Sequence, residues 1–153
     1  MTLRLGRIRL PATYLFGLLT AVLVVIGSTS PWLRTTGELF NGDIEVTHVI
    51  GISGDGQATL AMGIFAGVLI LWKVLRRRSS GIGLAAVILV LAIAGLVGVF
   101  NWSELHRIPR IEGQTWSYFQ FYYQAGWGLI VVTCAGFAGA IAMAYQMWND
   151  SYR

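Results

Sequence analysis

Four long stretches of the chain are almost free of charged residues, and they dominate its hydrophobic pattern. They span residues 11–30, 58–75, 81–100 and 125–147. A membrane-crossing helix needs about 20 mostly apolar residues, within a range of about 17 to 25. The pattern predicts an all-α membrane protein: a bundle of four transmembrane helices that forms one integral membrane domain over residues 1–153.

Composition supports the same interpretation. Hydrophobic residues make up 56% of the 153 and charged residues only 12%, whereas a soluble domain has about 25% charged residues. Six tryptophans fall at or near the ends of the predicted helices, where indole rings favour the headgroup layer. A cleaved signal peptide is an alternative for the first stretch. Its length and the Pro31-Trp32 pair that follows favour a retained helix.

Lysine and arginine are distributed unevenly over the segments that connect the four stretches. Cytoplasmic segments carry an excess of these residues. We therefore expect a multi-pass plasma-membrane protein with cytoplasmic N- and C-termini, whose net charge of +4 reflects topology and not nucleic-acid binding. The cytoplasmic side would hold Arg4, Arg7, Arg9, Lys73, Arg76, Arg77, Arg78 and Arg153 with Asp150, and the outer side Arg34, Arg107 and Arg110 with Glu38, Asp43, Glu45, Asp55, Glu104 and Glu112.

The outer loop over residues 31–57 contains a strand pattern. Residues 44–50 alternate apolar and polar side chains and are rich in β-branched residues, which is typical of a strand. Residues 32–36 are a candidate partner strand, and Asn41-Gly42 is a turn signal. We expect a small extracytoplasmic β-hairpin or sheet in this loop, resting on the outer end of the bundle.

The second outer loop, residues 101–124, ends in a dense aromatic run. One interpretation is an interfacial belt that leads into the fourth helix. The other is a docking surface for a partner protein, a lipid or an apolar ligand, because aromatic residues dominate such surfaces. The candidate residues are Trp116, Tyr118, Phe119, Phe121, Tyr122 and Tyr123.

Small residues recur at helical spacing in the second and fourth stretches. Small residues let membrane helices approach closely. They predict packing within the bundle or, as an alternative, a face for self-association. The residues concerned are Gly63, Gly67, Gly136, Gly139 and Ala140.

The segment GISGDGQATL, residues 51–60, places three glycines around one acid just before the second helix. It lacks the lysine of a phosphate-binding P-loop and the βαβ context of a dinucleotide site. The simplest interpretation is a helix cap, in which Asp55 accepts from the first N–H groups of the helix. Gly54 and Gly56 would permit the positive φ angles of a tight turn.

Three short motifs carry a resemblance to a known group. Pro31-Trp32 follows the first helix, Gly54-Asp55-Gly56 precedes the second, and Gly126-Trp127-Gly128 opens the fourth. In this respect the chain resembles a group of small four-helix membrane proteins of actinobacteria and archaea. The resemblance implies the topology and a plasma-membrane location, and it implies no activity. The likeness to claudin-type proteins is confined to architecture, because their paired loop cysteines are missing.

Catalytic, cofactor and metal sites are not expected. The core positions of the apolar stretches hold no Asp, Glu, Lys, Arg or His, and catalysis usually requires such groups. His48 and His106 both fall in outer loops, and an outer site of Glu104, His106 and Glu112 has nothing that fixes its geometry. Cys134 is the single cysteine and is expected to be a small packing residue.

Two functions remain open. The first is a non-enzymatic structural or interaction protein, an accessory subunit or self-associating scaffold whose partners are the bilayer and another membrane protein or a second copy. The alternative is a small oligomeric channel or transport component. A pore predicts that its polar residues line a water-accessible path, and a scaffold predicts that they hydrogen-bond within or between helices. The polar residues in question are Thr20, Ser28, Thr59, Thr133 and Gln146.

Overall fold

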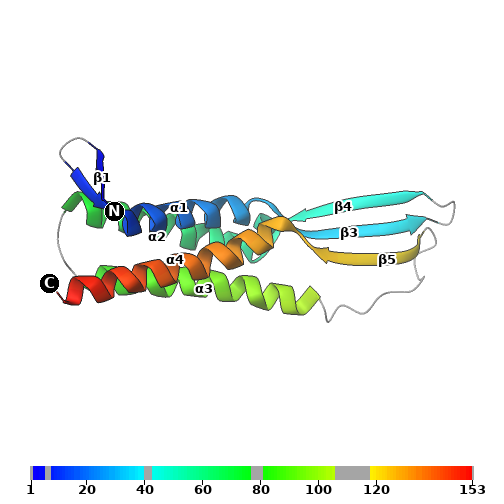
Figure 1. The fold of residues 1–153 in the computed structure, drawn as a ribbon. Coiled ribbons are helices and arrows are strands. Elements are labelled where there is room, and N and C mark those ends of the chain that lie inside the picture. The colour runs from blue at the N-terminus through cyan, green and yellow to red at the C-terminus, as the bar shows by residue number, and fades with distance from the viewer. Residues whose placement is uncertain (1, 6–7, 40–42, 77–80, 106–117, 153) are drawn as a thin grey trace.

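The computed structural model describes residues 2–5, 8–39, 43–76, 81–105 and 118–152, and its helices form a bundle (Figure 1). α1 contacts α2 and α4, and α3 contacts the same two helices. Both termini lie at one end of the bundle, and a β-sheet extends from the other. The predicted four-helix bundle with a small sheet is therefore confirmed. The helices are α1 (Ala12–Ser28), α2 (Gly56–Arg76), α3 (Gly81–Leu105) and α4 (Trp127–Ser151).

The helices differ from the predicted stretches in length. Within the described residues, α2, α3 and α4 are long and apolar enough to cross a membrane, whereas α1 has 17 residues and is shorter. At about 1.5 Å per residue, α1 spans about 25 Å. α3 and α4 instead run four or five residues past their predicted ends. The predicted boundaries were thus too long for the first helix and too short for the last two.

Local chemistry explains why α1 is short. Pro11 precedes the helix with extended angles, φ −57° and ψ 137°. At the other end, the hydroxyls of Ser28 and Ser30 donate to the carbonyls of Val24 and Ile26, at 2.7 Å and 2.6 Å. Such side-chain bonds compete with the helical pattern. Pro31 then begins a strand, because proline has no N–H to continue the helix.

Small residues set the distances between helices of the same chain. A Cβ on Gly63 of α2 would lie 3.0 Å from Val25 Cγ2 of α1, and one on Gly139 of α4 would lie 2.4 Å from Thr20 Oγ1 of α1. Ala140 of α4 is buried in the core. These contacts belong to the intramolecular packing that the small-residue pattern predicts. Cys134, which we expected among the packed residues, is exposed on α4.

The sheet contains the predicted hairpin. β3 (Pro31–Leu39) pairs antiparallel with β4 (Ile44–Ile50), and Thr35 lies opposite Thr47. The predicted turn at residues 41–42 lies outside the described residues. Every residue of β4 is exposed, and Figure 1 shows the sheet projecting beyond the end of the bundle, roughly in line with the helices. The expectation that the sheet rests on the bundle end is therefore wrong.

A third strand comes from the aromatic run. β5 (Tyr118–Ala125) pairs antiparallel with β3, which gives the order β4-β3-β5. Tyr118, Phe119, Phe121, Tyr122 and Tyr123 thus belong to a strand, and Trp116 lies outside the described residues. Aromatic residues favour strands as well as membrane interfaces, so their composition alone does not separate the two.

A second hairpin, which the sequence interpretation missed, precedes α1. β1 (Thr2–Leu5) pairs antiparallel with β2 (Ile8–Pro11), with Leu3 opposite Leu10. Apolar residues alternate with Arg4 and Arg9 in these strands, a period of two that is typical of strands. The hairpin lies at the same end of the bundle as the C-terminus (Figure 1).

The packing predicts unequal effects for two glycine substitutions. In Gly136→Ala, the new Cβ would lie 2.6 Å from Gly95 N and 2.8 Å from Leu91 O, which are backbone atoms of α3. We expect overpacking to lower the free energy of unfolding by about 1–3 kcal/mol. The measurement is the midpoint of denaturant unfolding of the purified protein in detergent.

Gly67→Ala is the matched control. Its Cβ would meet Ala21 Cβ at 3.8 Å, an ordinary van der Waals contact. The midpoint should therefore stay at or above the wild-type value, because alanine also favours a helix more than glycine does. Equal losses in the two variants would contradict the close approach of α3 and α4.

Candidate functional site

Three segments that are distant in sequence meet where the bundle joins the sheet. They are residues 30–32 after α1, residues 51–56 before α2 and residues 126–128 at the start of α4, and they carry the three motifs noted in the sequence. The Gly51 N–H donates to Ser30 O at 3.0 Å, and the Gly126 N–H donates to Trp32 O at 2.7 Å. We call this region the junction.

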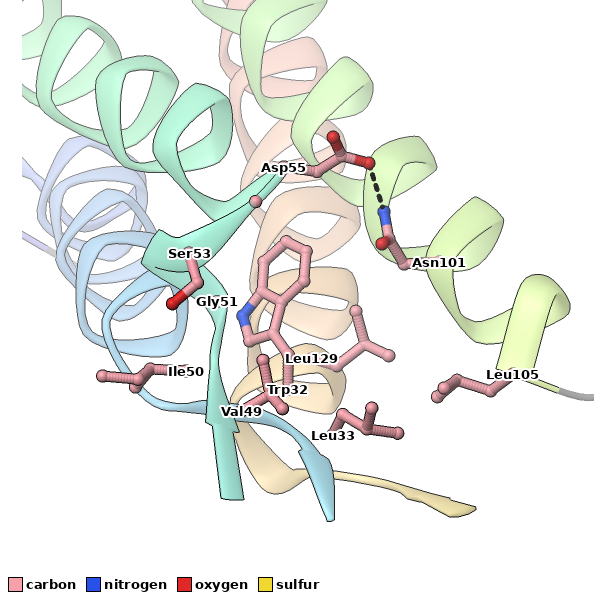
Figure 2. Close-up of a pocket in the computed structure, with 11 residues that line it drawn as sticks. Trp32, Leu33, Val49, Ile50, Gly51, Ser53, Asp55, Asn101, Leu105 and Leu129 are labelled. Carbon is pink, nitrogen blue, oxygen red and sulfur yellow. Dashed lines mark hydrogen bonds between the residues drawn. The ribbon is translucent and has the colours of Figure 1, made fainter. Parts of the chain in front are cut away.

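Trp32 lies at the centre of the junction (Figure 2). Its side chain is 7% exposed and packs with Leu129 and Val132 of α4. The indole Nε1 donates to Gly27 O of α1 at 2.9 Å. Trp127, at the start of α4, is 53% exposed. The interfacial position that we expected of all six tryptophans is therefore wrong for Trp32, whose ring is held by protein.

Glycines let backbone segments approach the Trp32 region. A Cβ on Gly51 would lie 2.3 Å from Trp32 Nε1, and one on Gly126 would lie 2.2 Å from Pro31 O. A Cβ on Gly56 would lie 2.3 Å from the carbonyl carbon of Gly51. Close approach therefore explains these three glycines.

The positive φ angles expected at Gly54 and Gly56 are not found. Gly54 has φ −153°, and Gly56 is the first residue of α2. The two glycines also differ in the space around them, because a Cβ on Gly54 would meet nothing within 4 Å. Gly56 allows close contact with Gly51 in the segment just before α2, a requirement that the sequence pattern does not reveal.

Asp55 directly precedes α2, as the cap interpretation requires. Its backbone carbonyl accepts from the N–H groups of Ala58 and Thr59, at 3.1 Å and 3.2 Å. Its carboxylate accepts from Asn101 Nδ2 of α3 at 3.0 Å, and the same amide group donates to Val97 O at 2.9 Å. Asp55 therefore links the start of α2 to the end of α3, and a side-chain cap stays a prediction.

A cleft of about 210 Å³ opens beside Trp32 (Figure 2). The base of the sheet, the segment before α2, the end of α3 and the start of α4 all contribute to it. Asp55, Ser53 and Asn101 give its lining polar groups. In the sequence, Asn101 stands out only as the first residue of a glycosylation sequon, Asn101-Trp-Ser103, and that pattern does not predict a place in a cleft. The apolar lining is made by Trp32, Leu33, Val49, Ile50, Leu105 and Leu129.

Polar side chains inside the bundle are hydrogen-bonded. Ser28 Oγ and Thr59 Oγ1 lie 2.8 Å apart and are both buried, joining α1 to α2 just below the junction. No buried side-chain polar atom of the described residues lacks a partner. The other bonds run from Thr20 to Gly17 O, from Thr133 to Leu129 O, from Gln146 to Asp150 and from Thr13 to Gln146.

Metal-ligand groupings are not found in the described part of the chain, where no three of His, Cys, Asp and Glu cluster. Of the outer acids and histidine considered in the sequence, Glu104 is exposed on the last turn of α3, and His106 and Glu112 lie outside the described residues. No protein-family model matches the chain, and no curated protein does. The junction and the surfaces beside it are therefore the basis for inferring function.

The junction predicts that Gly51 and Gly54 differ sharply in tolerance. Gly51→Ala would push a methyl group against Trp32, so the ends of β3 and β4 should loosen. We expect faster hydrogen–deuterium exchange in peptides that cover residues 31–39 and 44–50, with amide protection reduced about tenfold or more, equivalent to about 1.4 kcal/mol.

Gly54→Ala is the control, because the added methyl group has open space. Its exchange in both peptides should match the wild type. Unchanged exchange in Gly51→Ala would show that the Trp32 contact does not hold the sheet.

Proposed function

We propose that this chain is a non-enzymatic integral membrane protein that presents its β-sheet to a partner. The four helices cross the plasma membrane, both termini are cytoplasmic, and the sheet stands on the outer side. The partner is another membrane protein, for which this chain is an accessory subunit, or a second copy in a self-associating scaffold. No nucleic acid takes part.

The outer surface of the bundle supports the membrane assignment. Large apolar side chains are exposed on all four helices, including Leu19, Val68, Leu89 and Ile141, each at least 54% exposed. Soluble monomers rarely expose apolar patches larger than a few hundred Å². The position of both termini at one end, opposite the sheet, agrees with an even number of crossings (Figure 1). The excess of basic residues on the terminal side favours the cytoplasm for that side.

The exposure of β4 is the observation that carries the proposal. β4 is an edge strand of a three-stranded sheet, and all seven of its residues are exposed. Ile44 is 69% exposed and Val46 is 40% exposed. An exposed edge strand offers backbone N–H and C=O groups that can pair with another chain. Because the junction fixes the base of the sheet, this strand is held away from the bundle.

The hydrogen bonds inside the bundle favour a scaffold over a pore. A pore would need polar side chains turned toward a water-accessible path. Thr20, Ser28, Thr59, Thr133 and Gln146 instead bond to backbone or side chains of the same chain. Their polar groups are thus engaged in holding the helices together.

Val46→Lys tests the role of β4. A lysine on an edge strand disfavours pairing with another chain. We expect association to weaken about tenfold or more, which corresponds to about 1.4 kcal/mol. The measurement is native mass spectrometry of the tagged protein, extracted from its own membranes in gentle detergent, which gives the partner and its stoichiometry.

Gln124→Lys is the control, because it adds the same charge to an exposed position on the other edge strand, β5. It should retain the partner. A bare monomer from wild-type membranes, or an association that Val46→Lys leaves intact, would contradict the proposal.

A further inference from the structure

The cleft beside Trp32 combines features that the sheet-docking function does not use. Its walls come from β3, β4, the segment before α2, α3 and α4, and Trp32 and Leu129 on its apolar side are also part of a buried cluster. Its polar groups gather where Asp55 meets Asn101 across the gap between α2 and α3 (Figure 2). A cleft with an apolar wall and a few convergent polar groups is typical of a small-ligand site.

The charge of the cleft favours a cation. Among the described residues that line it, Asp55 is the one with an ionisable side chain. Three N–H groups at the helix start beside it donate to backbone carbonyls and not to this carboxylate. Gln57 N–H donates to Gly54 O at 3.0 Å, and the next two N–H groups donate to the Asp55 carbonyl. The partial positive charge at the start of α2 is smaller than the full negative charge of Asp55.

The amide of Asn101 orients the carboxylate without neutralising it. Asn101 Nδ2 donates both to Asp55 Oδ2 and to Val97 O, so the amide is held by its own helix. Asp55 itself is exposed. A positively charged group in the cleft would therefore meet a fixed carboxylate on one side and the indole of Trp32 on the other. Indole rings attract cations through their π-electrons, by about 0.5–2 kcal/mol.

We propose that this cleft binds a small organic ammonium group. Its volume of about 210 Å³ is below the range of about 300–1,000 Å³ that is usual for drug-sized ligands. An alkylated ammonium suits the mixed lining, because its carbon atoms contact Leu105 and Trp32 while its charge faces Asp55. The source is a free amine or the headgroup of a lipid.

Choline and its uncharged isostere 3,3-dimethyl-1-butanol are the probes that test this inference. The full chain, in nanodiscs of phosphatidylglycerol, is titrated with each by ligand-detected NMR. We expect saturable choline binding and at least about tenfold weaker binding of the isostere, since the two differ in charge and hardly in shape. Equal binding of both, or no saturable binding of choline, would overturn the proposal.

Two variants locate the site. Asp55→Asn removes the charge and keeps an acceptor for Asn101, and Leu105→Phe reduces the space while leaving the charge in place. Each should weaken choline binding about tenfold. Glu104→Gln removes an acid that is exposed on the same helix end and does not line the cleft, and it should bind choline within about twofold of wild type. A loss in Glu104→Gln as large as in Asp55→Asn would overturn the site assignment.

A lipid arm identifies the source of the ammonium group. Phosphatidylcholine is added to the nanodiscs, and the choline titration is repeated. A rise in the apparent Kd of choline means that headgroups occupy the cleft, and an unchanged Kd means that the ligand is a free amine. Both results require the cleft to bind ammonium, and neither depends on β4 or on the partner tested above.

Discussion

The contacts of the Trp32 indole determine how the sheet joins the helices. Trp32 belongs to β3 and lies between the Pro31–Ile50 and Leu33–Val49 pairs that β3 forms with β4. Its N–H donates back to α1, its ring packs on α4, and its carbonyl accepts from the residue before α4. Gly51 lies against the ring edge at the point where β4 returns to the bundle. The chain passes between bundle and sheet at α1–β3, β4–α2 and β5–α4, and all three connections are held around the Trp32 side chain.

The helices of the bundle are held together mainly by close packing and hydrogen bonds, because the chain has few charged residues. In a bilayer, where lipid offers no hydrophobic drive for helix association, close backbone contact and satisfied polar groups would hold the helices. Gly136 against α3 and the Ser28–Thr59 pair between α1 and α2 are examples of each. Small residues lie at these contacts between helices. Many large apolar side chains are instead exposed on the outer surface of the bundle, where a bilayer would cover them.

The sequence predicted those features that depend on local pattern. Apolar runs located the four helices, and the alternation over residues 44–50 located β4. Features that depend on long-range contact were missed. The composition of the aromatic run at 118–125 does not by itself predict a strand, and only the pairing with β3 shows one. Trp32 follows an apolar run as an interfacial tryptophan would, and only the approach of α4 and Gly51 buries it. Asn101 becomes part of the cleft because α3 continues beyond its apolar stretch.

Labelling with a membrane-impermeant maleimide tests the central claim that the bundle spans the membrane and carries the sheet on the side opposite the termini. Cys134→Ser removes the single cysteine, and one cysteine is then placed on the sheet by Thr47→Cys or near the end of α4 by Ser151→Cys. Both positions are exposed. We predict that intact cells label Thr47→Cys and that Ser151→Cys reacts only after permeabilisation. Labelling of both positions in intact cells, or protection of Thr47→Cys, would contradict the account.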